Sequence, residues 1–320
     1  MSTALEVRSF RRSDRDQLTQ LVNTHAAAVV PGVSASVSAV LSALERQPSE
    51  FIEDPWVSER VTLVAEQASR IAAAAHLVRY FPDERAGSSA RNVGEIRWLL
   101  FWPETPAGNA YWPDSRQAAE ALMAACLGQL QAWGVARQEA GGELPVPGVY
   151  GVPEQWPHVS ALYERAGFVH GGHAEIIYFA KVEDLRRAAA APIAGLSARR
   201  TVGMNGTRLS AILGDDVIGY IEVEIFDAGE RSSRNGGLAD IGNLHVTQLY
   251  RRRGVGTWLV QQAAEWLSAA SVNVLLAYAW LEGTDPGGRD YADDRVFLPA
   301  AGFQELTRTR RGWNRAPITP

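Results

Sequence analysis

Two short motifs recur in the same order in the two halves of the chain, and this repeat constrains the fold more than any other feature. "GEIRWL" (94–99) is echoed by "ADIGNL" (239–244), and "LYERAGF" (162–168) is echoed by "FLPAAGF" (297–303). In each half an apolar stretch with helical periodicity separates the two motifs. A chain of 320 residues is also long enough to form two domains. We therefore expect two domains built on one plan.

Apolar periodicity predicts strands and helices in mixed order in the first half. Strands are expected at residues 4–10, 60–67, 70–81, 92–102 and 174–181 with a short one at "GVYGV", and helices at residues 13–30, 36–47, 115–133 and 158–168. This order is too interleaved for an all-α or an all-β domain, and it indicates the α/β class.

The second half is predicted to repeat this plan in shortened form. Strands are expected at residues 207–213, 217–226, 238–247 and 272–280 and at the C-terminus, and helices at residues 257–269 and before "LPAAGF". Nothing here corresponds to the helix pair at residues 13–47. Between the halves, residues 182–198 are rich in alanine and contain Pro192 and Gly195, as is typical of a linker. The expected domains are residues 1–181 and residues 199–320.

Composition limits the classes of function. The chain is 46% hydrophobic and 21% charged, as in an ordinary globular protein, and its net charge of −5 argues against a nucleic-acid partner. Its first residues are too polar for a signal peptide, and no apolar run is long enough to span a membrane, so we expect a cytoplasmic protein without a membrane partner. His170 and His173 have no third ligand nearby in the sequence, so no metal is expected. Homo-oligomerisation stays open.

The stretch "RRRGVG" (251–256) lies between a predicted strand and an amphipathic helix. The first turn of a helix has unsatisfied N–H groups and a positive dipole end, and glycines let the backbone approach a ligand closely. No lysine is present for a P-loop, and Leu259 stands where a dinucleotide fingerprint needs glycine. Two interpretations are open: a plain strand-to-helix turn, or a loop that holds a phosphate or pyrophosphate.

In its context, this loop resembles the signature of the GNAT family of acyl-CoA-dependent N-acetyltransferases. That signature is a strand, the loop Q/R-x-x-G-x-G/A and a helix, and the family's second motif, a helix ending in Gly-Phe, occurs at Phe168 and Phe303. The resemblance covers nearly the whole chain as two tandem GNAT-like domains, the first of them degenerate. It implies that each domain is a twisted mixed β-sheet flanked by helices.

By the same resemblance, the chain moves an acetyl group from acetyl-CoA, a co-substrate, to the amine of a small molecule by direct transfer in a ternary complex. The residues implied to bind acetyl-CoA are Leu244, His245, Val246, Arg251, Arg252, Arg253, Gly254, Val255, Gly256 and Thr257. The alternative is a CoA-binding sensor or partner-binding protein without catalysis.

Four residues are candidates for handling the amine. Asp240 is the first choice of base, because a catalytic glutamate occupies the corresponding strand position in some family members. His245 is the alternative, since it would lie beside the thioester and has a suitable unperturbed pKa. Glu222 and Glu224 alternate along one strand and share a face. That face is either plain solvent or an acidic wall that binds a cationic substrate.

The second half departs from the family pattern at the position of the acid for the leaving thiolate. The family tyrosine four residues before the glycine of Gly-Phe is present as Tyr163 in the first half, but the second half has Leu298 there. Tyr291 would share a helical face with Leu298 and is the candidate, unless the thiolate leaves without a protein acid. The first half also lacks the R-x-x-G-x-G loop. We therefore expect that it does not bind acetyl-CoA and instead supports the acceptor site.

Overall fold

The computed structural model describes residues 5–45, 55–103, 115–146, 148–185, 190–226, 237–281 and 292–316. The chain divides into two compact units, which are residues 1–174 with 309–320 (unit 1) and residues 175–308 (unit 2). In the described parts, no helix is long and apolar enough to cross a membrane.

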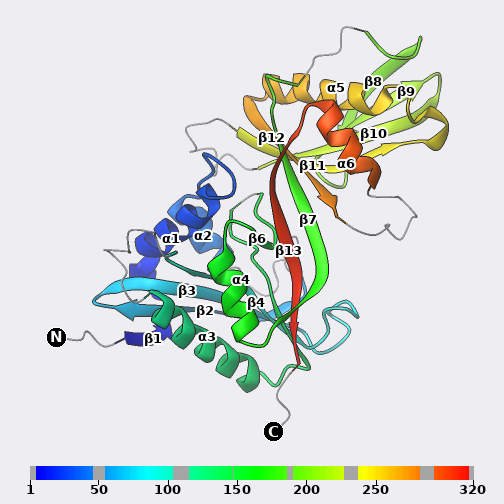
Figure 1. The fold of residues 1–320 in the computed structure, drawn as a ribbon. Coiled ribbons are helices and arrows are strands. Elements are labelled where there is room, and N and C mark those ends of the chain that lie inside the picture. Colours follow the sequence, from blue (N-terminus) through cyan, green and yellow to red (C-terminus); the bar gives the residue numbers. More distant parts are fainter. Residues whose placement is uncertain are drawn as a thin grey trace. The chain divides into compact units, whose positions relative to one another are not determined.

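Unit 1 contains a twisted sheet (Figure 1). Its strand order is β1-β2-β3-β4-β5-β13, where β13 is Gln304–Arg315, and β6 also pairs with β13. All of its pairs are antiparallel except β4 with β5. The helices α1 and α3 pack on β3 and β4. The elements, in chain order, are β1 (Leu5–Ser9), η1 (Arg12–Asp14), α1 (Arg15–Ala27), α2 (Val37–Glu45), β2 (Val57–Gln67), β3 (Arg70–Tyr80), β4 (Val93–Phe101), α3 (Ser115–Ala132), β5 (Arg137–Ala140), β6 (Val152–Pro153) and α4 (Pro157–Arg165).

Unit 2 contains a sheet in the order β7-β12-β11-β10-β9-β8, where β11 and β12 are parallel and the other pairs are antiparallel. Helix α5 packs on one face of this sheet, against the apolar side chains of β9, β10 and β11. The elements are β7 (Val169–Lys181), β8 (Leu196–Val202), β9 (Thr207–Leu213), β10 (Asp216–Ile225), β11 (Gly237–Val246), η2 (Gln248–Tyr250), α5 (Val255–Ala269), β12 (Val272–Trp280), α6 (Ala292–Ala301) and β13 (Gln304–Arg315).

The repeat seen in the sequence is also a repeat of structure. The motif at 94–99 lies in β4, between an antiparallel and a parallel neighbour, and the motif at 239–244 lies in β11 in the same arrangement. The helices α4 and α6 also end alike, since Phe168 N donates to Tyr163 O and Phe303 N donates to Leu298 O, each at 3.0 Å. As predicted, β8 and β9 are joined only by the turn at residues 203–206, with no counterpart of α1 and α2.

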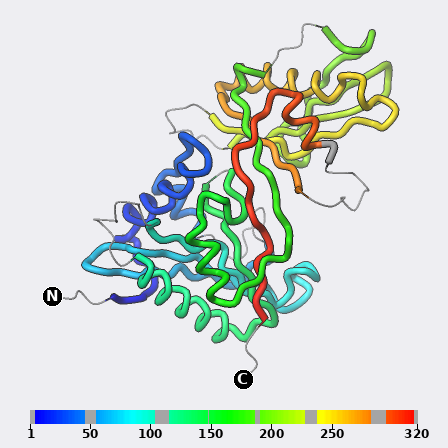
Figure 2. The backbone as a smooth tube through the Cα atoms, viewed as in Figure 1, coloured from blue at the N-terminus to red at the C-terminus, as the bar shows by residue number. Residues whose placement is uncertain are grey.

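The strands that follow these two helices are exchanged between the sheets. Strand β7 follows α4 of unit 1 in the chain, but its residues 175–181 pair with β12 of unit 2. Strand β13 follows α6 of unit 2, but its residues 309–315 pair with β6 and β5 of unit 1. Figure 2 traces β13 as one extended red strand before the C-terminus. Each sheet is therefore completed by a strand from the other half of the sequence.

Two strands were not predicted from the sequence. Strand β5 has the polar sequence "RQEA", and β8 is exposed at every residue except Leu196, so neither shows an apolar alternation. Strand β8 begins inside the segment that was predicted as a linker. In "GVYGV", only Val152 is in a strand, the two-residue β6.

Candidate functional site

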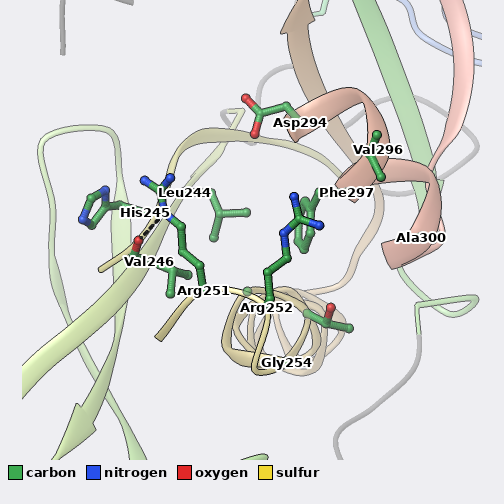
Figure 3. Close-up of a pocket in the computed structure, with 12 residues that line it drawn as sticks. Leu244, His245, Val246, Arg251, Arg252, Gly254, Asp294, Val296, Phe297 and Ala300 are labelled. Atoms are coloured by element: carbon green, nitrogen blue, oxygen red, sulfur yellow. Dashed lines mark hydrogen bonds between the residues drawn. The ribbon is translucent and has the colours of Figure 1, made fainter. Parts of the chain in front are cut away.

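A pocket of about 350 Å³ opens in unit 2 between the end of β11, the start of α5 and one side of α6 (Figure 3). Leu244 points into it, whereas His245 points to the other side of β11, as alternation along a strand requires. The residues that line the pocket are Leu244, His245, Val246, Arg251, Arg252, Gly254, Gly256, Thr257, Asp294, Val296, Phe297 and Ala300. Eight of these twelve are among the residues that were expected to bind acetyl-CoA.

Two of the expected binding residues do not line the pocket. Val255 is buried in the core, and the guanidinium of Arg253 lies 5.8 Å from the ring of Tyr250. The four lining residues from α6 were not predicted. Their helix was expected from "LPAAGF", and the spacing of Asp294, Phe297 and Ala300 on one helical face was the available signal.

The loop before α5 presents N–H groups to this pocket. Arg252 and Gly254 have positive φ values of 60° and 80°, which turn the chain sharply before the helix begins at Val255. The first intrahelical bond runs from Trp258 N to Gly254 O, so the N–H groups of residues 255–257 have no acceptor within the helix. Together with the dipole and the exposed side chains of Arg251 and Arg252, they make a site suited to an anion.

A side chain at either glycine of the loop would be crowded. A Cβ on Gly254 would lie 3.2 Å from Cβ of Pro192, on a backbone that L-residues rarely adopt. A Cβ on Gly256 would lie 3.2 Å from Cε2 of Phe297. The Arg251 side chain is fixed by a 3.0 Å hydrogen bond from Nε to the carbonyl oxygen of Val246. These contacts pack the loop closely against the rest of unit 2. We call residues 251–257, with their N–H groups and arginine side chains, the anion cradle.

The parallel strands β11 and β12 separate beside this pocket. Their pairing ends with Asp240 opposite Leu276, although β11 continues to Val246 and β12 to Trp280. We call the segments beyond these two residues the β11–β12 fork. In the described part of the chain, no strand pairs with β11 along this side of the fork. Its backbone can therefore pair with an extended ligand, as a sheet edge pairs with a peptide.

Unit 1 has the same fork between β4 and β5, but the chain itself closes it. Beyond the last pair, Gly141 N donates to Ile96 O at 2.9 Å and Glu143 N donates to Arg97 O at 3.0 Å. The buried Tyr163 hydroxyl donates to Gly141 O at 2.8 Å and holds this segment in place. The tyrosine that matches the family motif thus has a structural partner in unit 1.

A β-bulge in β11 brings the candidate polar residues to one face of the unit 2 sheet. Glu224, Glu222 and Tyr220 of β10 lie opposite Asp240, Asn243 and His245 respectively, so Gly242 is the extra residue. Without the bulge, Asp240 and His245 would point to opposite faces, because they are five residues apart. A Cβ at Gly242 would lie 2.6 Å from Cβ of Asn205, so the turn between β8 and β9 requires glycine there.

Asp240 is a buried carboxyl group with an unsatisfied atom. It is 7% exposed, and its Oδ1 has no hydrogen-bond partner among the residues that the structure describes. Burial raises the pKa of Asp240 to about 7; the charge of Glu224 raises it too, and the Tyr278 hydroxyl opposes both. A carboxylate with this pKa can accept and release a proton near neutral pH.

Glu222 and Glu224 differ sharply, although they share this face. Glu222 is 1% exposed and accepts hydrogen bonds from Arg208 Nε at 2.7 Å and from the amide nitrogens of Met204 and Asn205. Burial favours the neutral form of Glu222, but these donors outweigh it and hold its pKa below the ordinary value. Glu224 is exposed and has no ion pair within the described segments. Glu222 thus organises the β8–β9 turn, and Glu224 is available to a ligand.

Among the described candidates for catalysis and acceptor binding, only His245 is one of the residues that line the pocket. The ring of His245 packs beside that of Tyr220, at 5.7 Å between centroids. Leu298 is buried in the core. Tyr291 lies outside the described residues. Among the residues described, no group of three or more His, Cys, Asp or Glu could hold a metal ion.

Comparisons with known proteins agree with this geometry. Residues 179–285 match the model of the acetyltransferase (GNAT) family. No curated protein matches the chain.

Solved structures resemble the chain over nearly its whole length. One is a tandem GNAT protein from the clavulanic acid biosynthesis pathway (without AcCoA), at 14% identity and a TM-score of 0.66, with coverage of 99% of this chain and 100% of that one. Another is a GCN5-related N-acetyltransferase from Sphaerobacter thermophilus, at 13% identity and a TM-score of 0.60, with coverage of 99% and 96%.

Proposed function

We propose that this chain transfers an acetyl group from acetyl-CoA to the amine of a small molecule. The proposal starts from the match of residues 179–285 to the acetyltransferase (GNAT) family model and from the fold that the chain shares with a solved tandem GNAT protein. The observation that carries the proposal is the juxtaposition in unit 2 of an anion cradle, an open strand fork and a buried carboxyl group of raised pKa. These are the parts that binding a thioester and deprotonating an amine require.

The cradle fits the pyrophosphate of acetyl-CoA. The N–H groups of residues 255–257 and the guanidinium groups of Arg251 and Arg252 would hold the phosphates, and the β11 backbone at residues 244–246 would pair with the pantetheine arm. The bound co-substrate would supply an activated acyl group as a thioester. Backbone N–H groups of β11 at the fork would then polarise its carbonyl.

Asp240 is the proposed base, with His245 as the alternative. An alkylammonium ion has a pKa of about 10.4 and cannot attack until it loses a proton. Asp240 would take that proton, because its Oδ1 is buried and unpartnered beside the fork. The C–N bond then forms as the C–S bond breaks, and the second proton of the amine nitrogen passes to the departing thiolate. Tyr291, the proposed acid, would relay this proton by donating its hydroxyl proton to the thiolate and recovering the one that the nitrogen loses.

Unit 1 is proposed to support the acceptor site and not to bind acetyl-CoA itself. Its fork is closed by residues 141–143, and Tyr163 holds them there. The Arg-x-x-Gly-x-Gly sequence of the unit 2 cradle is absent from unit 1. A single cofactor site per chain follows from this division of roles.

Calorimetric titration with acetyl-CoA and an assay of thiol release with a panel of amines test the proposal. We expect one site per chain, turnover with at least one amine, and loss of turnover in Asp240→Asn with acetyl-CoA affinity retained. Binding without turnover for every amine would support the non-catalytic sensor. Two sites per chain would contradict the role given to unit 1.

A further inference from the structure

We infer that the acceptor carries two cationic groups, and that Glu224 binds one of them while Asp240 takes the ammonium that reacts. This inference rests on the proposed function and names the substrate class of the same site: a diamine or polyamine. We call Glu224 and Asp240 the acidic pair.

Within the described residues, the acidic pair is a negative site with no neutralising partner. Glu224 lies directly opposite Asp240 in the β10–β11 register. Two residues along β10, on the same face, Glu222 has Arg208 and three further N–H donors. Arg208 thus neutralises the carboxylate beside the acidic pair, and in the described chain neither member of the pair has an ion-pair partner. A cationic ligand would provide the missing charge.

At the register positions next to the pair, the neighbouring strands place no cationic side chain. Continuing the β9–β10 register one step beyond Val223 and Thr207 places Gly206 opposite Glu224, and a Cβ there would lie 3.0 Å from Cα of Glu224. On the β12 side, Asp240 faces Leu276, with Tyr278 next on the same face. His245, farther along β11, is the nearest titratable nitrogen on this face of β11. The pair is therefore bordered by glycine, leucine and tyrosine.

The different solvent exposure of the two carboxylates indicates which group of the acceptor each one binds. Asp240 is buried at the fork, where the thioester would lie, and Glu224 is exposed on the solvent side. Residues opposite each other in an antiparallel pair have Cβ atoms about 5 Å apart. A short chain with an ammonium at each end can therefore contact both carboxylates at once. An acceptor with one charge leaves Glu224 unpaired, and an acceptor with a carboxylate near its amine is repelled by Glu224.

Putrescine and butylamine form a matched pair of probes, because they differ by one ammonium group. We expect wild-type kcat/KM to be higher for putrescine than for butylamine. In Glu224→Gln this preference should fall by roughly twofold to fivefold, the contribution of one exposed ion pair. Asp216→Asn is the control, because it removes the same charge from an exposed position at the other end of β10.

The outcomes separate this inference from the proposed function. Equal kcat/KM for the two amines, or a preference unchanged in Glu224→Gln, would overturn the inference while leaving the transferase intact. If neither amine is acetylated, calorimetric titration of putrescine alone decides. Binding that is weakened in Glu224→Gln but not in Asp216→Asn supports the inference and counts against the enzyme. Absence of putrescine binding, or equal binding to both variants, overturns the inference.

Discussion

The Tyr163 hydroxyl donates a 2.8 Å hydrogen bond to the carbonyl oxygen of Gly141, in the segment that closes the fork of unit 1. The equivalent helix in unit 2 has Leu298 at this position, where no such bond can form. One substitution therefore accompanies a closed fork in one half and an open fork in the other. This contrast supports different roles for the two halves.

Replacing Tyr163 by phenylalanine tests the structural role of this bond. The variant leaves the Gly141 carbonyl without its donor, so we expect the free energy of unfolding to fall by about 1–2 kcal/mol in urea titration. Turnover at saturating acetyl-CoA should stay at the wild-type level. A variant of normal stability with lost turnover would place Tyr163 in the chemistry and contradict the closed-fork interpretation.

Replacing Gly254 by alanine tests the anion cradle. The residue has φ = 80°, and the new Cβ would lie 3.2 Å from Pro192, so the loop must distort. We expect a loss of stability of about 1–2 kcal/mol and a weakened affinity for acetyl-CoA in calorimetry. The control is Gly128→Ala, in an exposed helical position with no heavy atom within 4 Å of the new Cβ. That change should be neutral or stabilising. Unaltered affinity in Gly254→Ala would remove the loop from the cofactor site.

Asp240→Asn should increase stability at alkaline pH while abolishing turnover. The ordinary aspartate pKa is about 3.9, and burial raises that of Asp240 to about 7. The folded state thus holds the proton more tightly than the unfolded state, so stability falls as pH rises from about 4 to about 7. The variant has no such loss, and at pH 8 it should be more stable than the wild type, by a few kcal/mol at most. The two proteins should match at pH 4. A variant that is less stable at pH 8 would contradict the buried, unpartnered state of this side chain.

Tyr278→Phe should move the acidic limb of the kcat/KM profile to higher pH. The Tyr278 hydroxyl lowers the pKa of Asp240, so its removal leaves the carboxyl group protonated over a wider range. The loss of activity should therefore be larger at pH 6.5 than at pH 8.5. Tyr220→Phe is the matched control, because the Tyr220 hydroxyl accepts a bond from Asn243 Nδ2 at 3.2 Å and is not among the groups that shift Asp240. If the pH profiles of kcat/KM are the same in both variants, the Tyr278 hydroxyl does not influence the catalytic base.

Much of the fold could be predicted because apolar residues recur at regular spacing in most of its helices and strands. The helix at 257–269 was placed by Leu259, Ala263, Ala264 and Leu267, and α5 buries all four. Strands β5 and β8 lack such a pattern, because their side chains are mostly polar or exposed. The exchange of β7 and β13 could not be read from local sequence, since which strand a segment pairs with depends on contacts distant in the chain.

The candidate site was predictable in part for a similar reason. The anion cradle is formed by one contiguous loop with characteristic glycines and arginines, so a sequence motif could identify it. The distinction between Glu222 and Glu224 depends on Arg208 and on the β8–β9 turn, which alternation along β10 does not reveal. Asp240 and His245 share a face because of the bulge at Gly242, after which the alternation of side chains along β11 is shifted by one residue.

The exchange of β7 and β13 means that the sequence repeat is not an independent folding module. A fragment of residues 199–320 lacks the strand that pairs with β12, and a fragment of residues 1–181 lacks the strand that pairs with β5. Each fragment exposes an unsatisfied sheet edge and should aggregate when expressed alone. Co-expression should let the two fragments complement each other and co-purify. The two halves of the sequence therefore depend on each other to complete their sheets.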